Sequence, residues 1–256
     1  MLQDAHIHIQ DAGPEGEKIL RGAARNGVGR FFCNGATPSD WEAVKSLSRS
    51  CDGVVPFFGV HPWYIDEAVP DWEKTLAGYL SDTAARIGEI GLDRAKRGIS
   101  FERQLEVFRT QLDIASEMQR PFTVHCVQAW DALLQELHRR VPRAGHKTPF
   151  IIHWFSGSPE VAGDLVKLGA YISFSPRLID AVGGKQEESF RQVPADRILL
   201  ETDYPYMPGA PSGVMTDAQS YFSTLHSLYK GAAALKGMRE DEFTRRVWDN
   251  GTVFVY

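Results

Sequence analysis

Histidine and carboxylate residues recur along this chain at positions that suit metal-ion chemistry. His6 and His8 stand two residues apart in an apolar stretch, so on a β-strand both imidazoles would point to the same side of a sheet. Such a pair can bind a divalent metal ion, although two buried histidines with ordinary hydrogen-bond partners would give the same pattern. Four further residues of the ligand type end other apolar stretches: Glu89, His125, His153 and Asp203. Among apolar neighbours an unpaired imidazole is costly, and metal coordination would supply its partner.

The apolar stretches that carry these residues alternate with longer amphipathic stretches along the whole chain. This alternation is typical of repeated βα units, in which the strands are parallel. Eight strands are predicted, at Ala5–Ile9, Gly29–Asn34, Val54–Val60, Arg86–Leu92, Phe122–Cys126, Phe150–Trp154, Ala170–Phe174 and Arg197–Glu201. Helices are predicted between them, at Gly16–Asn26, Ser39–Ser48, Asp71–Ser81, Phe101–Met118, Trp130–Arg140 and Pro159–Leu168.

Eight βα units could form a closed barrel or an open doubly wound sheet. The open sheet usually binds phosphate through a glycine-rich turn after its first strand, and no such turn follows Ile9. In a barrel, active sites are assembled at the C-terminal ends of the strands, where the candidate ligands stand. We therefore predict a single (β/α)₈ TIM barrel domain over residues 1–256, with its active site at those strand ends. The Pro- and Gly-rich stretch Pro205–Gly213 predicts a long loop after the last strand.

The composition is that of an ordinary globular protein, with 43% hydrophobic and 24% charged residues and no apolar run long enough to span a membrane. The N-terminal residues do not resemble a secretory signal, and Cys33, Cys51 and Cys126 are too widely spaced for a disulfide framework or a zinc–thiolate cluster. We therefore expect a cytoplasmic protein without a membrane partner. Because the net charge is −5, a nucleic-acid substrate would have to be held locally.

The motifs around the candidate ligands resemble those of the TatD family of metal-dependent hydrolases, within the amidohydrolase-like barrels. The matching segments run nearly end to end: Asp4–His8, Gly59–Pro62, Gly88–Asp93, Val124–His125, His153–Ser158 and Leu200–Pro205. The resemblance implies two divalent metal ions, one held by His6, His8, Glu89 and Asp203 and the other by Glu89, His125 and His153. Glu89 would bridge the two ions.

Catalytic roles are predicted for Asp203 and Glu89 from the chemistry of their positions, and the resemblance implies one for His61. Two adjacent metal ions can lower the pKa of a shared water and stabilise the attacking and leaving oxygens of an in-line displacement. Asp203 would take the proton of that water, and Glu89 is available as the bridge because no lysine ends a predicted strand. His61 would contact a substrate phosphoryl oxygen, although a helix-capping or loop-packing role also fits. Mixed His and carboxylate ligands accept Zn²⁺, Mn²⁺, Ni²⁺ or Fe²⁺, and Mg²⁺ could serve in turnover.

Other polar residues near these motifs have less specific interpretations. Asp93 shares the strand parity of the bridging glutamate and could orient a metal ligand. Glu201 is expected either to be paired inside the barrel or to take a direct role. Cys126 is expected to be a small buried hydrophobe, not a nucleophile, because its parity is opposite to that of the neighbouring histidine. The remaining histidines show no partner pattern: His138, His146 and His226.

Two departures from the family pattern concern the substrate. The family usually has an arginine two residues after the histidine of the fifth strand, where this chain has Val127. It also tends to have a basic, Asn-containing segment after the last strand, where this chain has the uncharged stretch Met207–Thr216. Basic residues near predicted strand ends could replace these contacts, although many such residues only face solvent: Arg94, Lys96, Arg97 and Arg177.

Three functions remain open from the sequence. The resemblance implies a phosphodiesterase acting on DNA ends, that is, a deoxyribonuclease of the TatD type. The missing basic residues favour a second hypothesis, in which the same metals hydrolyse a small ester, amide or phosphoester. A non-catalytic barrel that binds metal for stability or interaction is the third.

Overall fold

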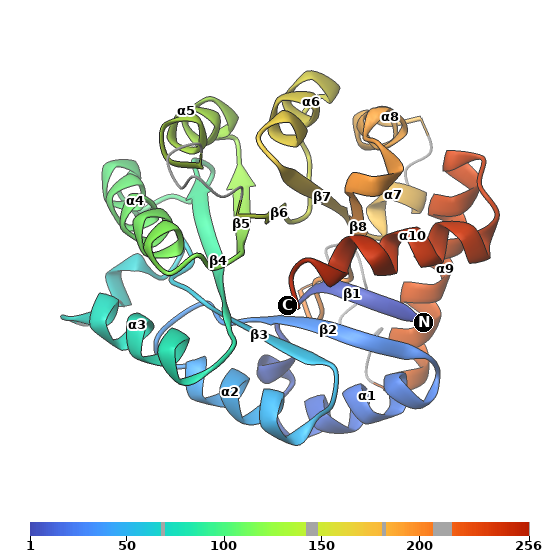
Figure 1. Ribbon diagram of the computed structural model, residues 1–256, viewed down its shortest axis with the longest axis horizontal. Coiled ribbons are helices and arrows are strands. Elements are labelled where there is room, and N and C mark those ends of the chain that lie inside the picture. The colour runs from blue at the N-terminus through green and yellow to red at the C-terminus, as the bar shows by residue number, and fades with distance from the viewer. Residues whose placement is uncertain (68–69, 142–147, 181–182, 207–216, 256) are drawn as a thin grey trace.

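The strands form one parallel sheet that curls into a barrel, as the computed structural model shows for residues 1–67, 70–141, 148–180, 183–206 and 217–255 (Figure 1). The strands are β1 (Leu2–Ile7), β2 (Val28–Asn34), β3 (Val54–Phe58), β4 (Arg86–Asp93), β5 (Phe122–Val127), β6 (Phe150–Ile152), β7 (Ala170–Phe174) and β8 (Ile198–Leu200). They pair in sequence order, each parallel to the next. A parallel bridge between Ile7 and Tyr204 brings the chain after β8 back to β1. The predicted TIM barrel is confirmed.

Helices cover the outside of the barrel (Figure 1). They are α1 (Pro14–Arg25), α2 (Trp41–Ser50), α3 (Trp72–Asp82), α4 (Phe101–Glu117), α5 (Trp130–Arg140), α6 (Pro159–Lys167), α7 (Arg177–Asp180), α8 (Lys185–Gln192), α9 (Ala218–Lys236) and α10 (Glu240–Thr252). Every predicted helix is present with its ends within two residues of the prediction. Among the described helices, none has both the length and the apolarity needed to cross a lipid bilayer.

The N-terminal half of the barrel is filled with apolar side chains. One buried cluster takes residues from six different strands together with Phe254 near the C-terminus: Ala5, Phe32, Val55, Phe57, Ile151, Tyr171, Leu199 and Phe254. Side chains from so many strands can meet only inside the barrel. The candidate metal ligands lie toward the opposite end, where the strands terminate.

Two strands that carry site residues, β1 and β6, end earlier than predicted. β1 covers Leu2–Ile7, not the predicted Ala5–Ile9, because Ile9–Ala12 forms a 3₁₀ turn instead of continuing the strand. His8 therefore lies just beyond the strand, and His153 likewise follows the end of β6. In β4, Gly91 has φ +151°, and a Cβ atom there would lie 2.0 Å from the carbonyl oxygen of His125. Only glycine allows β4 and β5 to approach this closely.

Candidate metal centre

A cavity of about 460 Å³ opens at the C-terminal ends of the strands. His61, predicted to be catalytic, lines it. So do five of the six predicted metal ligands: His8, Glu89, His125, His153 and Asp203. The sixth ligand, His6, is fully buried beneath them and contacts two of them. The structure thus brings all the predicted site residues together from five strand ends and one loop.

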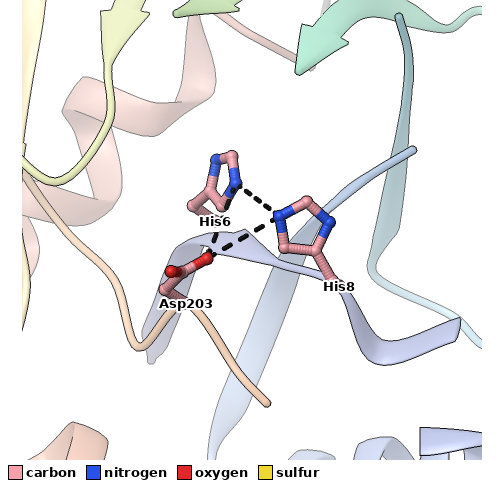
Figure 2. A group of neighbouring side chains, drawn as sticks. All are labelled: His6, His8 and Asp203. Carbon is pink, nitrogen blue, oxygen red and sulfur yellow. Dashed lines mark hydrogen bonds and ion pairs between the residues drawn. The ribbon is translucent and has the colours of Figure 1, made fainter. Parts of the chain in front are cut away.

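The first group of ligand atoms surrounds the two histidines of β1 and its end. The Nε2 atoms of His6 and His8 lie 3.1 Å apart and point toward Asp203, at 3.8 and 3.7 Å from its Oδ1 (Figure 2). The same two nitrogens lie 3.2 and 3.1 Å from Oε2 of Glu89. In a tetrahedral site with bonds of about 2.0–2.1 Å, neighbouring ligand atoms are about 3.3 Å apart. These four side chains therefore have the spacing of ligands around a single ion.

The second group surrounds the other oxygen of the same glutamate. Oε1 of Glu89 lies 3.1 Å from Nδ1 of His125, 2.9 Å from Nε2 of His153 and 3.5 Å from Nε2 of His61. Glu89 thus presents one oxygen to each group. His61 was not among the predicted metal ligands, but it lies close enough to belong to the second group of potential ligands.

Outer hydrogen bonds orient the imidazole rings. Nδ1 of His8 donates to the carbonyl oxygen of Asn34 at 2.8 Å, and Nδ1 of His153 lies 3.0 Å from Oε1 of Glu201. Nε2 of His125 lies 3.3 Å from Oδ2 of Asp93. Partners of this kind fix the tautomer and leave the opposite nitrogen free to bind a metal. Asp93 has the orienting position proposed for it, and Glu201 is paired inside the barrel.

Burial and charge act in opposite directions on the pKa values in the site. Burial raises the pKa of Asp203 from 3.8 to about 7, against the positive charges of His153 and His8. At Glu89, burial also acts to raise the pKa, but the charges of several imidazoles, first His153, hold it well below its usual value. Burial acts to lower the pKa of His8, but the hydrogen bond to Glu89 and the negative charges of Glu89 and Asp203 together outweigh it and raise that pKa from 6.5 to about 9. The site therefore favours positive charge beside Glu89, which a divalent ion can supply in place of imidazole protons.

Two buried atoms of the first group lack hydrogen-bond partners within the described part of the chain: Oδ1 of Asp203 and Nδ1 of His6. An unpaired carboxylate oxygen in a buried position is costly, and a cation coordinated by Oδ1 would remove that cost. Burial also lowers the pKa of His6 to about 4, so its imidazole is neutral, as a metal ligand must be. The residues present therefore fit divalent metal ions.

Aromatic side chains on the cavity wall were missed from the sequence. Trp63, Tyr64, Trp154 and Tyr206 line the cavity, and Trp63 and Tyr206 are exposed. A signal was available at Trp63, which stands two residues after the catalytic candidate of the same loop. Exposed aromatic residues above a polar site often mark a binding surface.

The basic residues proposed to replace the missing family contacts differ in their surroundings. Arg94 is paired with Asp131 on the outside of the barrel, at 2.6 Å, and Lys96 lies over the ring of Trp63. Arg177 lines the cavity. Val127 also lines it, so the position of the usual arginine is at the cavity wall but apolar. Residues 207–216 lie outside the described residues, as does His146.

Cys126, His138 and His226 lie outside the two groups of potential metal ligands. Cys126 is buried in the hydrophobic core, and burial raises the pKa of its thiol, which fits a small hydrophobe. His138 is exposed in the last turn of α5. His226 has a partner that its sequence neighbourhood does not reveal, because its Nε2 lies 3.1 Å from Oε1 of Glu240.

Comparison with known proteins gives consistent matches. The family model described as TatD related DNase matches residues 3–254. The chain is 28% identical over 255 residues to the Bacillus subtilis protein named uncharacterized metal-dependent hydrolase YabD, covering 98% of this chain and 97% of that protein. It is 29% identical over 195 residues to the 3'-5' ssDNA/RNA exonuclease TatD of Erwinia tasmaniensis, covering 75% and 74%. The crystal structure of YjjV, a TatD homolog from Escherichia coli, superposes with a TM-score of 0.87 and 26% identity, covering 99% of this chain and 97% of that chain.

Proposed function

Since the chain belongs to the TatD family of metal-dependent hydrolases, we propose that it is a deoxyribonuclease that hydrolyses phosphodiester bonds at DNA ends. The names of two relatives support this substrate, because one is a 3'-5' ssDNA/RNA exonuclease and the other a putative deoxyribonuclease of Danio rerio. Membership of a family of hydrolases and the complete ligand set speak against a non-catalytic barrel.

The position of Glu89 is the observation that carries the proposal. Its two carboxylate oxygens face two separate groups of ligand atoms, Oε2 toward His6 and His8 and Oε1 toward His125 and His153. A bridging carboxylate between two metal ions requires this division. We therefore propose two divalent ions, with Asp203 completing the first ligand group. The His and carboxylate donors suit Zn²⁺, Mn²⁺, Ni²⁺ or Fe²⁺, and Mg²⁺ in turnover.

When bound, two such ions would activate a water and stabilise the attacking and leaving oxygens of an in-line displacement. Asp203 is the residue proposed to accept the proton of that water, because its Oδ1 faces the first ligand group and has no hydrogen-bond partner among the described residues. His61 lines the cavity, and its Nδ1 accepts a hydrogen bond from the backbone N–H of Trp63 at 3.2 Å. Its ring is thereby held where it can contact a substrate phosphoryl oxygen.

The substrate phosphate that the family usually contacts through an arginine after the fifth strand needs another partner in this chain. Val127 cannot bind phosphate, whereas Arg177 begins α7, directly after β7, and lines the same cavity. Loops after β7 and β8 often bind phosphate in barrels of this type. We assign a substrate phosphate contact to Arg177.

A small ester, amide or phosphoester remains the second candidate substrate. The apolar Val127 on the cavity wall favours it, since a wall with little positive charge holds a polyanion weakly. We also propose a cytoplasmic location, which the three buried free cysteines support.

The proposed function is tested by nuclease assays on short single-stranded DNA, with Mg²⁺ and Mn²⁺ tested separately. The native chain is compared with Glu89→Ala, which removes the bridge, and with Asp203→Asn, which keeps the shape of the side chain but not the base. We expect metal-dependent release of nucleotides by the native protein, loss of activity in Glu89→Ala, and a decrease in kcat of about 10²–10⁴-fold in Asp203→Asn.

Elemental analysis of each protein separates the possible failures. A native protein that holds two metal ions but degrades no DNA would contradict the nuclease proposal and favour a small substrate. An Asp203→Asn protein with full metal content and full activity would contradict the role of Asp203 as the base.

A further inference from the structure

Trp63 combines exposure with an unusually fixed position. It lies in the loop after β3, lines the cavity, and keeps 42% of its surface exposed. Its indole Nε1 nevertheless donates a hydrogen bond to Oδ2 of Asp93 at 2.6 Å. A large exposed aromatic side chain that is already ordered loses little further conformational entropy when it binds a ligand.

The carboxylate that holds Trp63 is itself firmly placed. Oδ1 of Asp93 accepts hydrogen bonds from the backbone N–H groups of Ala95 and Lys96, at 2.8 and 3.1 Å. The backbone N–H of Asp93 donates to Oε1 of Gln104 at 2.7 Å, and Nε2 of Gln104 donates to the backbone carbonyl oxygen of Asp93 at 3.0 Å. These bonds fix the main chain and Oδ1 of Asp93, whereas Oδ2 is contacted by the indole N–H of Trp63 and by His125.

The same carboxylate joins Trp63 to the metal centre. Oδ2 of Asp93, which accepts the indole hydrogen bond, also lies 3.3 Å from Nε2 of His125. One carboxylate oxygen thus links the cavity wall to a candidate metal ligand.

The ring of Trp63 lies beside the reacting positions. Its centroid is 5.4 Å from that of His61 and 6.3 Å from that of His125, and Nζ of Lys96 lies over the ring at 4.4 Å from its centroid. Aromatic side chains next to a backbone-binding groove stack on unpaired bases in proteins that bind single-stranded nucleic acid. The cation of Lys96 adds attraction for the phosphate next to such a base.

We propose that Trp63 is a substrate-binding residue that stacks on an unpaired base adjacent to the scissile phosphodiester, while its indole N–H holds Asp93 in place to orient His125. This inference rests on the proposed nuclease function and adds to it the residue that recognises the base. A duplex end would have to open before its base could reach the ring.

The test compares two single-stranded oligothymidylates of equal length and charge, one intact and one abasic at the nucleotides that flank the scissile bond. The native protein is compared with Trp63→Ala, which removes the ring, and with Trp63→Phe, which keeps a ring but removes the N–H. Trp248→Phe is the matched control, because Trp248 on α10 is partly buried with Arg30 over its ring at 4.1 Å and does not line the cavity.

We expect the native protein and Trp248→Phe to prefer the intact oligonucleotide by about 5- to 150-fold in kcat/KM, the effect of losing one base–aromatic stack. Trp63→Ala should lose this preference, and Trp63→Phe should keep most of it. Trp63→Phe should bind Mn²⁺ more weakly than the native protein, by up to about 10- to 100-fold, because Asp93 loses a partner.

An unchanged base preference in Trp63→Ala would overturn the stacking role. Unchanged Mn²⁺ affinity in Trp63→Phe would overturn the link to His125. If the native protein cleaves neither oligonucleotide, binding of both is measured by fluorescence anisotropy. Base-dependent binding that is lost in Trp63→Ala would support the stacking role although the nuclease proposal had failed, and binding without base discrimination would overturn it. Absence of binding would overturn both.

Discussion

Arg177 differs from the other basic residues near the metal centre in the contacts of its side chain. Arg94 makes two hydrogen bonds with the carboxylate of Asp131, at 2.6 and 3.2 Å, and Lys96 is placed over an aromatic ring. Within the described residues, Arg177 is the only lysine or arginine on the cavity wall, and it has no ion pair there. A guanidinium without an anionic partner can bind phosphate without first breaking an existing pair.

We predict that Arg177→Met lowers kcat/KM on single-stranded DNA by about 10- to 100-fold, because a charge-assisted hydrogen bond to phosphate is lost. The decrease should come mainly from KM. The slope of log(kcat/KM) against log[salt] should also become shallower by about 0.7, the value for one phosphate contact on a single strand.

Arg94→Met is the control, since it removes the same charge from a residue that is already paired with Asp131. It should stay within about twofold of the native protein, as exposed ion pairs contribute little. An Arg177→Met protein with an unchanged salt slope would show that Arg177 does not contact phosphate.

At the scale of elements, one buried carboxylate connects β1 to the segment that follows β8. Asp4 is completely buried and accepts hydrogen bonds from the hydroxyl and the backbone N–H of Thr202, at 2.6 and 3.0 Å. It also accepts one from the hydroxyl of Tyr221 on α9, at 2.6 Å. Because Asp203 follows Thr202 directly and has a left-handed backbone, φ 56°, these contacts hold a strained metal-ligand candidate next to His6.

Asp4→Ala should lower the free energy of unfolding by about 2–5 kcal/mol, because two buried hydroxyl groups lose their acceptor. Activity should fall as well, since the segment that carries Asp203 is no longer held against β1. Tyr221→Phe removes only one of these hydrogen bonds and should lower the free energy of unfolding by about 1–3 kcal/mol. Denaturant unfolding of the two variants measures both effects, and equal losses in the two would contradict the role of Asp4 as a joint between elements.

The candidate metal centre gathers residues from nearly the whole length of the molecule, from His6 in β1 to Asp203 after β8. The sheet is closed by pairing of neighbouring strands and by the Ile7–Tyr204 bridge. An ion bound here contacts ligands from several βα units at once, so it would stabilise the folded barrel as a whole and not a single element.

We predict one cooperative unfolding transition for residues 1–256, with the same midpoint by circular dichroism and by tryptophan fluorescence. Metal at 100 times its Kd should raise the free energy of unfolding by about 2.7 kcal/mol for one site, which corresponds to a rise in Tm of roughly 5–10 °C. A chelator should remove this increase. Glu89→Ala should show a much smaller metal effect. Two separate transitions would contradict the single-domain prediction, and a Tm independent of chelator would contradict metal binding by the folded state.

The sequence was sufficient to predict the fold and the candidate metal ligands. Apolar stretches of strand length alternate with amphipathic ones, and parallel strands in a barrel end on the same side. Any ligand-type residue at such an end is therefore brought to one place, whatever its distance along the chain. For this reason the positions of Glu89, His125, His153 and Asp203 could be predicted without coordinates, and only local details differed, such as β1 ending before His8.

The contacts that orient the site were decided by the tertiary structure alone. Trp63, in the loop after β3, and Asp93, the last residue of β4, are 30 residues apart, and nothing in the pattern around either predicts a hydrogen bond between them. The carbonyl oxygen of Asn34 that orients His8, and the clustering of Thr202 and Tyr221 around Asp4, were equally hidden. Strand periodicity fixes which way a side chain points, but a loop residue is placed by the particular hydrogen bonds and packing of its surroundings, which no local periodicity encodes.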